Sequence, residues 1–181
     1  MAEPETTEKI DADDAHVAGL SAGGAMAAVM AAGYPDLFAG VGVHSGIGYR
    51  AATDLPSAFA AMQGAGEPVP GRVPVRTSVF HGSGDHLVPV NADRIVDAAL
   101  AVHPGMTLRR TTFPAGSDTR AHVVESCRDG AGTTRVELWR VHCGHYWFGG
   151  DPVGSRPQRA GRLRRDGPVL PGSLSVRWDR L

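Results

Sequence analysis

The fold is decided by one stretch of sequence, Ala15-His16-Val17-Ala18-Gly19-Leu20-Ser21-Ala22-Gly23-Gly24-Ala25-Met26. A short apolar segment, residues 15–19, runs into Gly-x-Ser-x-Gly, and an alanine-rich segment of helical character follows directly. This order of strand, tight turn and helix is typical of a nucleophile elbow, in which a serine hydroxyl stands clear of the sheet. Gly19 and Gly23 are expected to be small because the backbones of strand and helix approach each other there. The motif alone is common, but its setting makes Ser21 a candidate nucleophile.

Outward from this turn, the sequence predicts a helix over residues 21–33, which Gly33 and Pro35 end. Further strands are expected over residues 37–43, 73–82, 108–113 and 136–141, and further helices over 49–66 and 91–102. Strands that alternate with helices indicate an α/β fold. The prediction is a mostly parallel sheet of about four to five strands with helices on both faces.

Three regions differ in composition. Residues 1–14 are polar and acidic and are expected to be a lead-in, and residues 15–154 are expected to form one α/β domain. Residues 155–181 are rich in Arg, Pro and Gly without a sustained apolar period, so this tail is expected to stay loose. The apolar content of 42% is sufficient for a core in a chain of 181 residues.

Bulk properties exclude several classes of function. The net charge is −1, and the arginines of the tail are not interleaved with aromatic residues, so no nucleic-acid partner is expected. No apolar run is long enough to span a membrane, and no signal peptide is recognisable; a cytoplasmic location is the default expectation. Cys127 and Cys143 lack the spacing of a metal site and are expected to be free thiols, or a disulfide if the protein is exported.

A serine nucleophile needs a base to take its proton and a carboxylate to orient that base. Asp85 follows the strand expected over residues 73–82, and the carboxyl end of a strand is where such a carboxylate belongs. Asp93 and Asp97 fall in an expected helix, and Asp54 precedes the third expected strand. Asp85 is therefore the first candidate for the acid.

Eight histidines compete for the role of base. His145 lies just beyond the last expected strand and beside Gly144, so it is better placed than His142. His44 ends a strand near Ser21 and is expected to line the site. Structural roles are expected for His16 and His81, and exposed positions for His103 and His122.

Four blocks of sequence, between about Asp11 and Gly154, together resemble the polyhydroxybutyrate depolymerase family. They are Gly-Leu-Ser-Ala-Gly-Gly-Ala-Met (residues 19–26), Val-His-Ser-Gly (43–46), His-Gly-Ser-Gly-Asp (81–85) with Val-Pro-Val-Asn (88–91), and Gly-His-Tyr-Trp-Phe-Gly-Gly (144–150). That family also contains feruloyl- and acetylxylan-esterase-like members of the α/β-hydrolase fold.

The resemblance implies a serine esterase that acts on a small or polymeric ester without a metal or organic cofactor. It implies Ser21 as nucleophile, Asp85 as acid and His145 as base, with the amide of Ala22 as one donor to the oxyanion. Substrate-binding positions are expected at His44, Tyr146 and Trp147. Tyr146 and Phe148 stand where the family has small residues, which is expected to crowd the pocket.

The chain also departs from the family pattern. Only about 14 residues precede the first expected strand, so the first half of the sheet is expected to be missing, together with the loop that provides a second oxyanion donor. The strand before Ser21 would then be an open edge at which another chain can pair. Two interpretations remain: an active serine esterase, or a truncated, weakly active or inactive fragment that self-associates through this edge.

Overall fold

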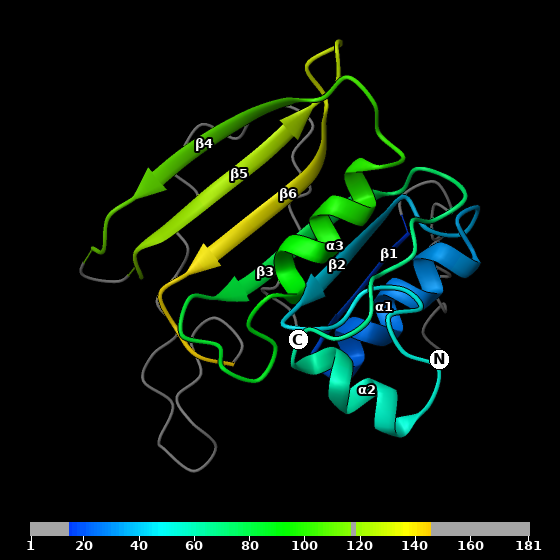
Figure 1. Ribbon diagram of the computed structural model, residues 1–181. Helices are drawn as coiled ribbons and strands as arrows, with labels where there is room; N and C mark the ends of the chain where they lie inside the picture. The colour runs from blue at the N-terminus through cyan, green and yellow to red at the C-terminus, as the bar shows by residue number, and fades with distance from the viewer. Residues whose placement is uncertain (1–14, 117–118, 146–181) are drawn as a thin grey trace, which may run out of the picture.

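The computed structural model describes residues 15–116 and 119–145 (Figure 1). The strands are β1 (His16–Leu20), β2 (Gly40–His44), β3 (Arg76–Gly82), β4 (Thr107–Phe113), β5 (His122–Arg128) and β6 (Thr134–Val141), and the helices are α1 (Ala22–Gly33), α2 (Leu55–Met62) and α3 (Asn91–Leu100). The expectations for residues 1–14 and 155–181, and those for Tyr146 and Trp147, lie outside the described residues. No helix of the described ranges has the length and apolar character needed to cross a membrane.

The six strands form one sheet in the order β1-β2-β3-β6-β5-β4. β1, β2, β3 and β6 run parallel to their neighbours, whereas β5 is antiparallel to β6 and β4 is antiparallel to β5. The mixed sheet with its helices confirms the α/β class. The expected count of four to five strands is too low because β5 has no clear apolar pattern: Glu125 and Ser126 occupy its centre.

The core lies between the sheet and helices α1 and α3. The register places Val43, Val79 and Leu138 side by side on neighbouring strands, so their side chains share one face of the sheet. Ala27 of α1 and Ile95 of α3 belong to the same buried cluster. Both helices therefore cover the same face (Figure 1). The expectation of helices on both faces is not met within the described residues.

The opposite face carries a row of rings that crosses five strands. The ring centroids of His44 and Phe80 are 6.3 Å apart, those of Phe80 and Trp139 6.1 Å, and those of Trp139 and His122 5.8 Å. His122 and Phe113 complete the row at 4.6 Å. Stacked rings on adjacent strands stabilise the pairing of those strands. The row begins at His44, which lies at the carboxyl end of β2.

Candidate functional site

Ser21 occupies a sharp turn between β1 and α1. Its φ of 55° and ψ of −119° lie in a region that residues other than glycine rarely adopt. The Ser21 amide donates a hydrogen bond of 2.9 Å to the carbonyl of His44, which fixes the turn against the end of β2. A Cβ on Gly19 would overlap the carbonyl of Gly23, so the turn requires glycine there, as expected.

The second small residue of the turn is Gly24 and not Gly23. Nothing lies within 4 Å of a Cβ built on Gly23, so the expectation that Gly23 must be small is wrong. A Cβ on Gly24 would lie 2.9 Å from the Gly19 carbonyl and 3.1 Å from the His44 carbonyl. The helix backbone approaches the sheet most closely one residue later than the motif indicates. At Gly24 it lies against the backbone of β1 and of β2.

The Ser21 hydroxyl does not cap α1. Serine is a preferred N-cap residue, but here the side chain makes no capping hydrogen bond to the helix. Ala22 is the first residue of α1, and the amides of a first helical turn have no acceptor within the helix. Amide donors and the positive end of the helix dipole thus lie beside a half-buried hydroxyl.

Asp85 lies in the loop after β3 and is almost fully buried, with 4% of its surface exposed. Its Oδ1 accepts hydrogen bonds from the amides of Leu87 (2.9 Å) and Val88 (3.2 Å), and its Oδ2 lies 2.9 Å from Nδ1 of His145. Burial raises the pKa of Asp85, but the nearby Ser45 hydroxyl, His145 and the two amides outweigh it and hold the pKa below its usual value. The carboxylate is therefore ionised at neutral pH.

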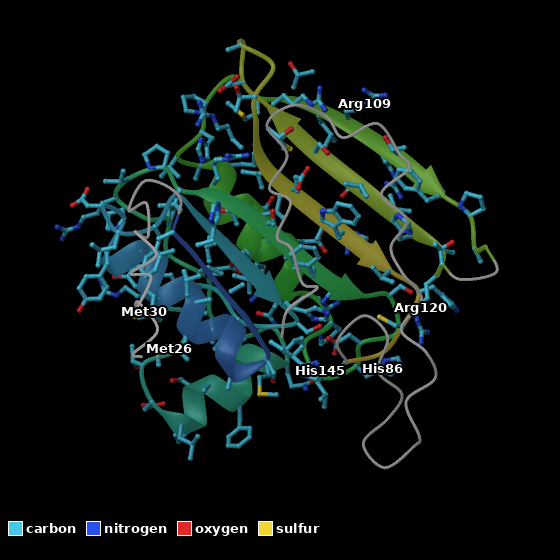
Figure 2. All side chains as sticks on the ribbon, turned by 180° about the vertical axis from the view of Figure 1, so that it is seen from behind. Met26, Met30, His86, Arg109, Arg120 and His145 are labelled. Carbon is cyan, nitrogen blue, oxygen red and sulfur yellow. The ribbon has the colours of Figure 1, made fainter. Side chains whose placement is uncertain are left out.

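His145 reaches Asp85 from the loop that follows β6. Two backbone hydrogen bonds join this loop to the end of β3: the Ser83 amide donates to the Val141 carbonyl (2.8 Å) and the Gly84 amide to the Cys143 carbonyl (2.9 Å). With Nδ1–H assigned as the donor to Asp85, Nε2 of His145 is left to accept a proton. Figure 2 shows His145 at the end of the sheet toward which the parallel strands run.

Two further buried histidines adjoin the site. His44 has 1% of its surface exposed, and its pKa is lowered to about 4 by burial, with smaller contributions from nearby His145 and His81. His81 places its Nδ1 3.8 Å from Oδ2 of Asp85, and its pKa is also lowered, chiefly by burial. The sequence predicted only a structural role for His81. The sequence signal for a place beside the site is that His81 lies four residues before Asp85.

The other candidate residues lie elsewhere. Asp54 caps α2, Asp93 forms an ion pair with Arg140, and Asp97 is exposed on α3. His142 approaches the hydroxyl of Ser83 at 3.5 Å and not the Asp85 carboxylate. The side chains of the described ranges contain no group of three or more residues suited to hold a metal ion.

The topology brings the predicted residues to one edge. Ser21 follows β1, His44 ends β2, Asp85 follows β3 and His145 follows β6. These four strands are parallel and adjacent, so their carboxyl ends meet at the same edge of the sheet. Asp85 and His145 are hydrogen-bonded, whereas a bond between Ser21 and His145 is not among the hydrogen bonds found for the described residues.

A strand, an elbow serine and a helix, followed by further parallel strands that carry a carboxylate and an imidazole, define an α/β-hydrolase-like fold. The family model described as "Esterase PHB depolymerase" matches residues 5–103, which is more than half of the chain. The chain belongs to this family. Ser21 and Asp85 lie within the matched residues, and His145 lies beyond them.

The chain is also similar to two individual proteins. Poly(3-hydroxyalkanoate) depolymerase C of Paucimonas lemoignei is 36% identical over 110 residues, which cover 52% of this chain and 26% of the relative. A solved structure, the acetyl xylan esterase from Aspergillus awamori, is 21% identical with a TM-score of 0.45, covering 75% of this chain and 55% of that one. The chain thus spans about a quarter of the depolymerase and about half of the esterase.

Proposed function

We propose that this chain hydrolyses carboxylic esters, with Ser21 as nucleophile, His145 as general base and Asp85 as the carboxylate that orients the base. The observation that carries the proposal is the backbone of Ser21, a non-glycine residue held at φ 55° between β1 and α1. Strain of this kind persists only where the surrounding structure enforces it, and it is concentrated at functional sites. The Asp85–His145 pair at the same sheet edge and the membership of an esterase family support it.

The reaction would follow two steps. Oγ of Ser21 forms a bond to the acyl carbon while Nε2 of His145 takes the Ser21 proton. The bond between the acyl carbon and the alcohol oxygen then breaks as His145 gives the proton to that oxygen. A water molecule then attacks the acyl-enzyme while His145 takes its proton, and the carboxylic acid leaves as Ser21 regains a proton. Asp85 holds the Nδ1–H of His145 and stabilises the imidazolium in both steps.

The amide of Ala22 is our candidate for one oxyanion donor. A donor of this kind contributes about 3 kcal/mol to transition-state stabilisation in enzymes where it has been removed. The Ala22 amide suits the role because α1 begins at this residue and no acidic side chain occupies the first turn. An acidic group there would repel the developing negative charge.

The substrate class that we propose is a polyhydroxyalkanoate-type ester or another short-chain acyl ester. The family and the similarity to a poly(3-hydroxyalkanoate) depolymerase support this class. We propose His44, Tyr146 and Trp147 as residues that line the substrate site. His44 suits an uncharged ester because its lowered pKa of about 4 keeps the imidazole neutral at the pH of the reaction.

The test is hydrolysis of p-nitrophenyl acetate and p-nitrophenyl butyrate by the wild type, by Ser21→Ala and by Ser83→Ala. Ser83 is an exposed serine in the loop before Asp85 and serves as the matched control. We expect Ser21→Ala to lose at least about a thousandfold in kcat and Ser83→Ala to retain the wild-type rate. A phosphonofluoridate should transfer its phosphonyl group to Oγ of Ser21 with loss of fluoride, so the wild type should gain the mass of that group and Ser21→Ala should not. Equal rates near background and no labelling would favour the alternative of an inactive chain.

A further inference from the structure

Ser45, the residue that follows β2, has a strained backbone. Its φ of 47° lies in the left-handed region, which residues other than glycine, asparagine and aspartate rarely adopt. The Ser45 amide donates a hydrogen bond of 2.9 Å to the carbonyl of Phe80 on β3, which holds the residue at the end of the sheet. Glycine would adopt this conformation without steric cost. Strain of this kind is concentrated at functional sites, so the side chain of Ser45 is a candidate for a function there.

Residues 44–46 lie between the elbow and the loop that carries the acid. The carbonyl of His44 accepts the hydrogen bond from the Ser21 amide, and a Cβ built on Gly46 would lie 3.1 Å from the Ser21 carbonyl oxygen. On its other side β2 pairs with β3, which leads into Asp85. The segment therefore adjoins the candidate nucleophile and the candidate acid at once.

The Asp85 carboxylate can accept one more hydrogen bond. An ionised carboxylate has about four acceptor positions, two on each oxygen. Oδ1 accepts from the amides of Leu87 and Val88, and Oδ2 accepts from His145. Nδ1 of His81 lies 3.8 Å from Oδ2, which is too far for a hydrogen bond. Among the hydrogen bonds found for the described part of the chain, one position on Oδ2 is thus unused.

The hydroxyl of Ser45 suits this position. Ser45 has 2% of its surface exposed, and a buried hydroxyl is costly without a hydrogen-bond partner. Burial raises the pKa of Asp85, and hydrogen bonding by the Ser45 hydroxyl is the largest of the effects that lower it. In this conformation the contact does not have the geometry of an ordinary hydrogen bond. Hydrogen bonds of an active site are often long or poorly aligned without substrate and tighten when it binds.

We propose that Ser45 is a positioning residue for ester hydrolysis: its hydroxyl donates to Oδ2 of Asp85 and holds the carboxylate in the orientation in which it accepts from Nδ1 of His145. The kinetic part of this inference rests on the proposed function. The left-handed backbone has a reason in this arrangement, because it directs a side chain from the end of β2 to the acid that follows β3. Ser45 is buried and acts on the substrate only through Asp85 and His145.

The first experiment measures kcat and KM on p-nitrophenyl acetate for the wild type, Ser45→Ala, Ser45→Gly and Ser78→Ala. Ser78→Ala is the matched control, since Ser78 is 1% exposed, lies within β3 and also interacts with a buried carboxylate, that of Glu137. We expect both Ser45 variants to lose at least about tenfold in kcat with KM unchanged, the loss that corresponds to one hydrogen bond to a charged group. Ser78→Ala should keep the wild-type kcat.

Urea unfolding of the two Ser45 variants separates positioning from stability. Ser45→Gly relieves the backbone strain, so it should unfold at a higher urea concentration than Ser45→Ala, although both lack the hydroxyl. A low kcat in the more stable variant then comes from the lost hydroxyl and not from unfolding. Circular dichroism verifies that each variant is folded.

The second experiment observes the Nδ1–H of His145 by proton NMR of the full chain, with the resonance assigned by its loss in His145→Gln. We expect this resonance to shift in both Ser45 variants and not in Ser78→Ala. A wild-type kcat and an unshifted resonance in Ser45→Gly overturn the proposal, as does a resonance that His81→Phe shifts and the Ser45 variants do not. A shift in a chain that hydrolyses no ester would contradict the proposed function and still support the contact between Ser45 and Asp85.

Discussion

Acidification should destabilise this protein through His44. The His44 imidazole is buried at the carboxyl end of β2, and its pKa in the folded protein is about 4, against an ordinary value of 6.5. Because the folded state resists protonation, the unfolded state binds more protons at every pH between these two values. The contribution of His44 to stability is therefore complete above pH 6.5 and is lost as the pH falls toward 4.

The size of the effect follows from the two pKa values. Linkage gives a loss of about 2.5 kcal/mol in the free energy of unfolding between pH 7.5 and pH 4.5, with a slope of about 1.2 kcal/mol per pH unit near pH 5. His81 adds a loss of the same sign because its pKa is also lowered. Glu137 acts in the opposite direction: burial raises its pKa, so its ionisation destabilises the fold as the pH rises.

The assay is urea unfolding at several pH values for the wild type and for His44→Gln, which cannot titrate. Subtraction of the two pH profiles cancels the contributions of His81 and Glu137 and leaves that of His44. His86→Gln, which removes an exposed histidine, is the control and should follow the wild type (Figure 2). Parallel profiles for the wild type and His44→Gln would refute the reasoning.

Three further predictions concern the elbow, the acid and a helix cap. Gly19→Ala should lower the free energy of unfolding by about 1–3 kcal/mol or more, because the new Cβ would overlap backbone atoms. Gly23→Ala, which has open space around it, should leave the free energy of unfolding unchanged or raise it by about 0.5–1 kcal/mol. Urea unfolding of the two variants compares these effects. Asp85→Asn should reduce kcat on p-nitrophenyl acetate by about 10⁴-fold with an unchanged circular dichroism spectrum, and a wild-type rate would contradict its role. Asp54→Ala should cost about 1 kcal/mol in thermal or urea unfolding, because Asp54 accepts from the Ser57 amide at 2.8 Å in a capping box.

Much of the site was predictable because its signals are local in the sequence. The strand, the glycine and the alanine-rich helix around Ser21 are contiguous, so the elbow can be derived from a dozen residues. Asp85 and His145 each follow an apolar run, and the carboxyl ends of parallel strands share an edge. Their pairing at 2.9 Å is what that inference requires, although their catalytic roles stay predictions.

The features that escaped prediction depend on contacts between distant segments. β5 contains Glu125 and Ser126 at its centre, and its place in the sheet comes from pairing with β6 and β4 and not from its own pattern. α3 covers the face of the sheet on which β3 and β6 present Val79 and Leu138. The choice of this face depends on several segments together, so no single segment of the sequence encodes it. Gly24, not Gly23, meets the sheet because the approach of α1 depends on the position of the His44 carbonyl.

The strand order also divides the site into two parts. Asp85 and His145 come from adjacent strands, so their hydrogen bond spans one strand spacing of about 4.8 Å. Ser21 follows β1, three spacings or about 14 Å from β6, so the loop that carries His145 must cross the end of β2 to reach the hydroxyl. His44 ends β2, the strand between β1 and β3, and its pKa is lowered chiefly by burial and in part by His145. In the mechanism that we propose, a charged His44 would repel the imidazolium formed on His145, so the burial that keeps His44 neutral would favour the proposed proton transfer between Ser21 and His145.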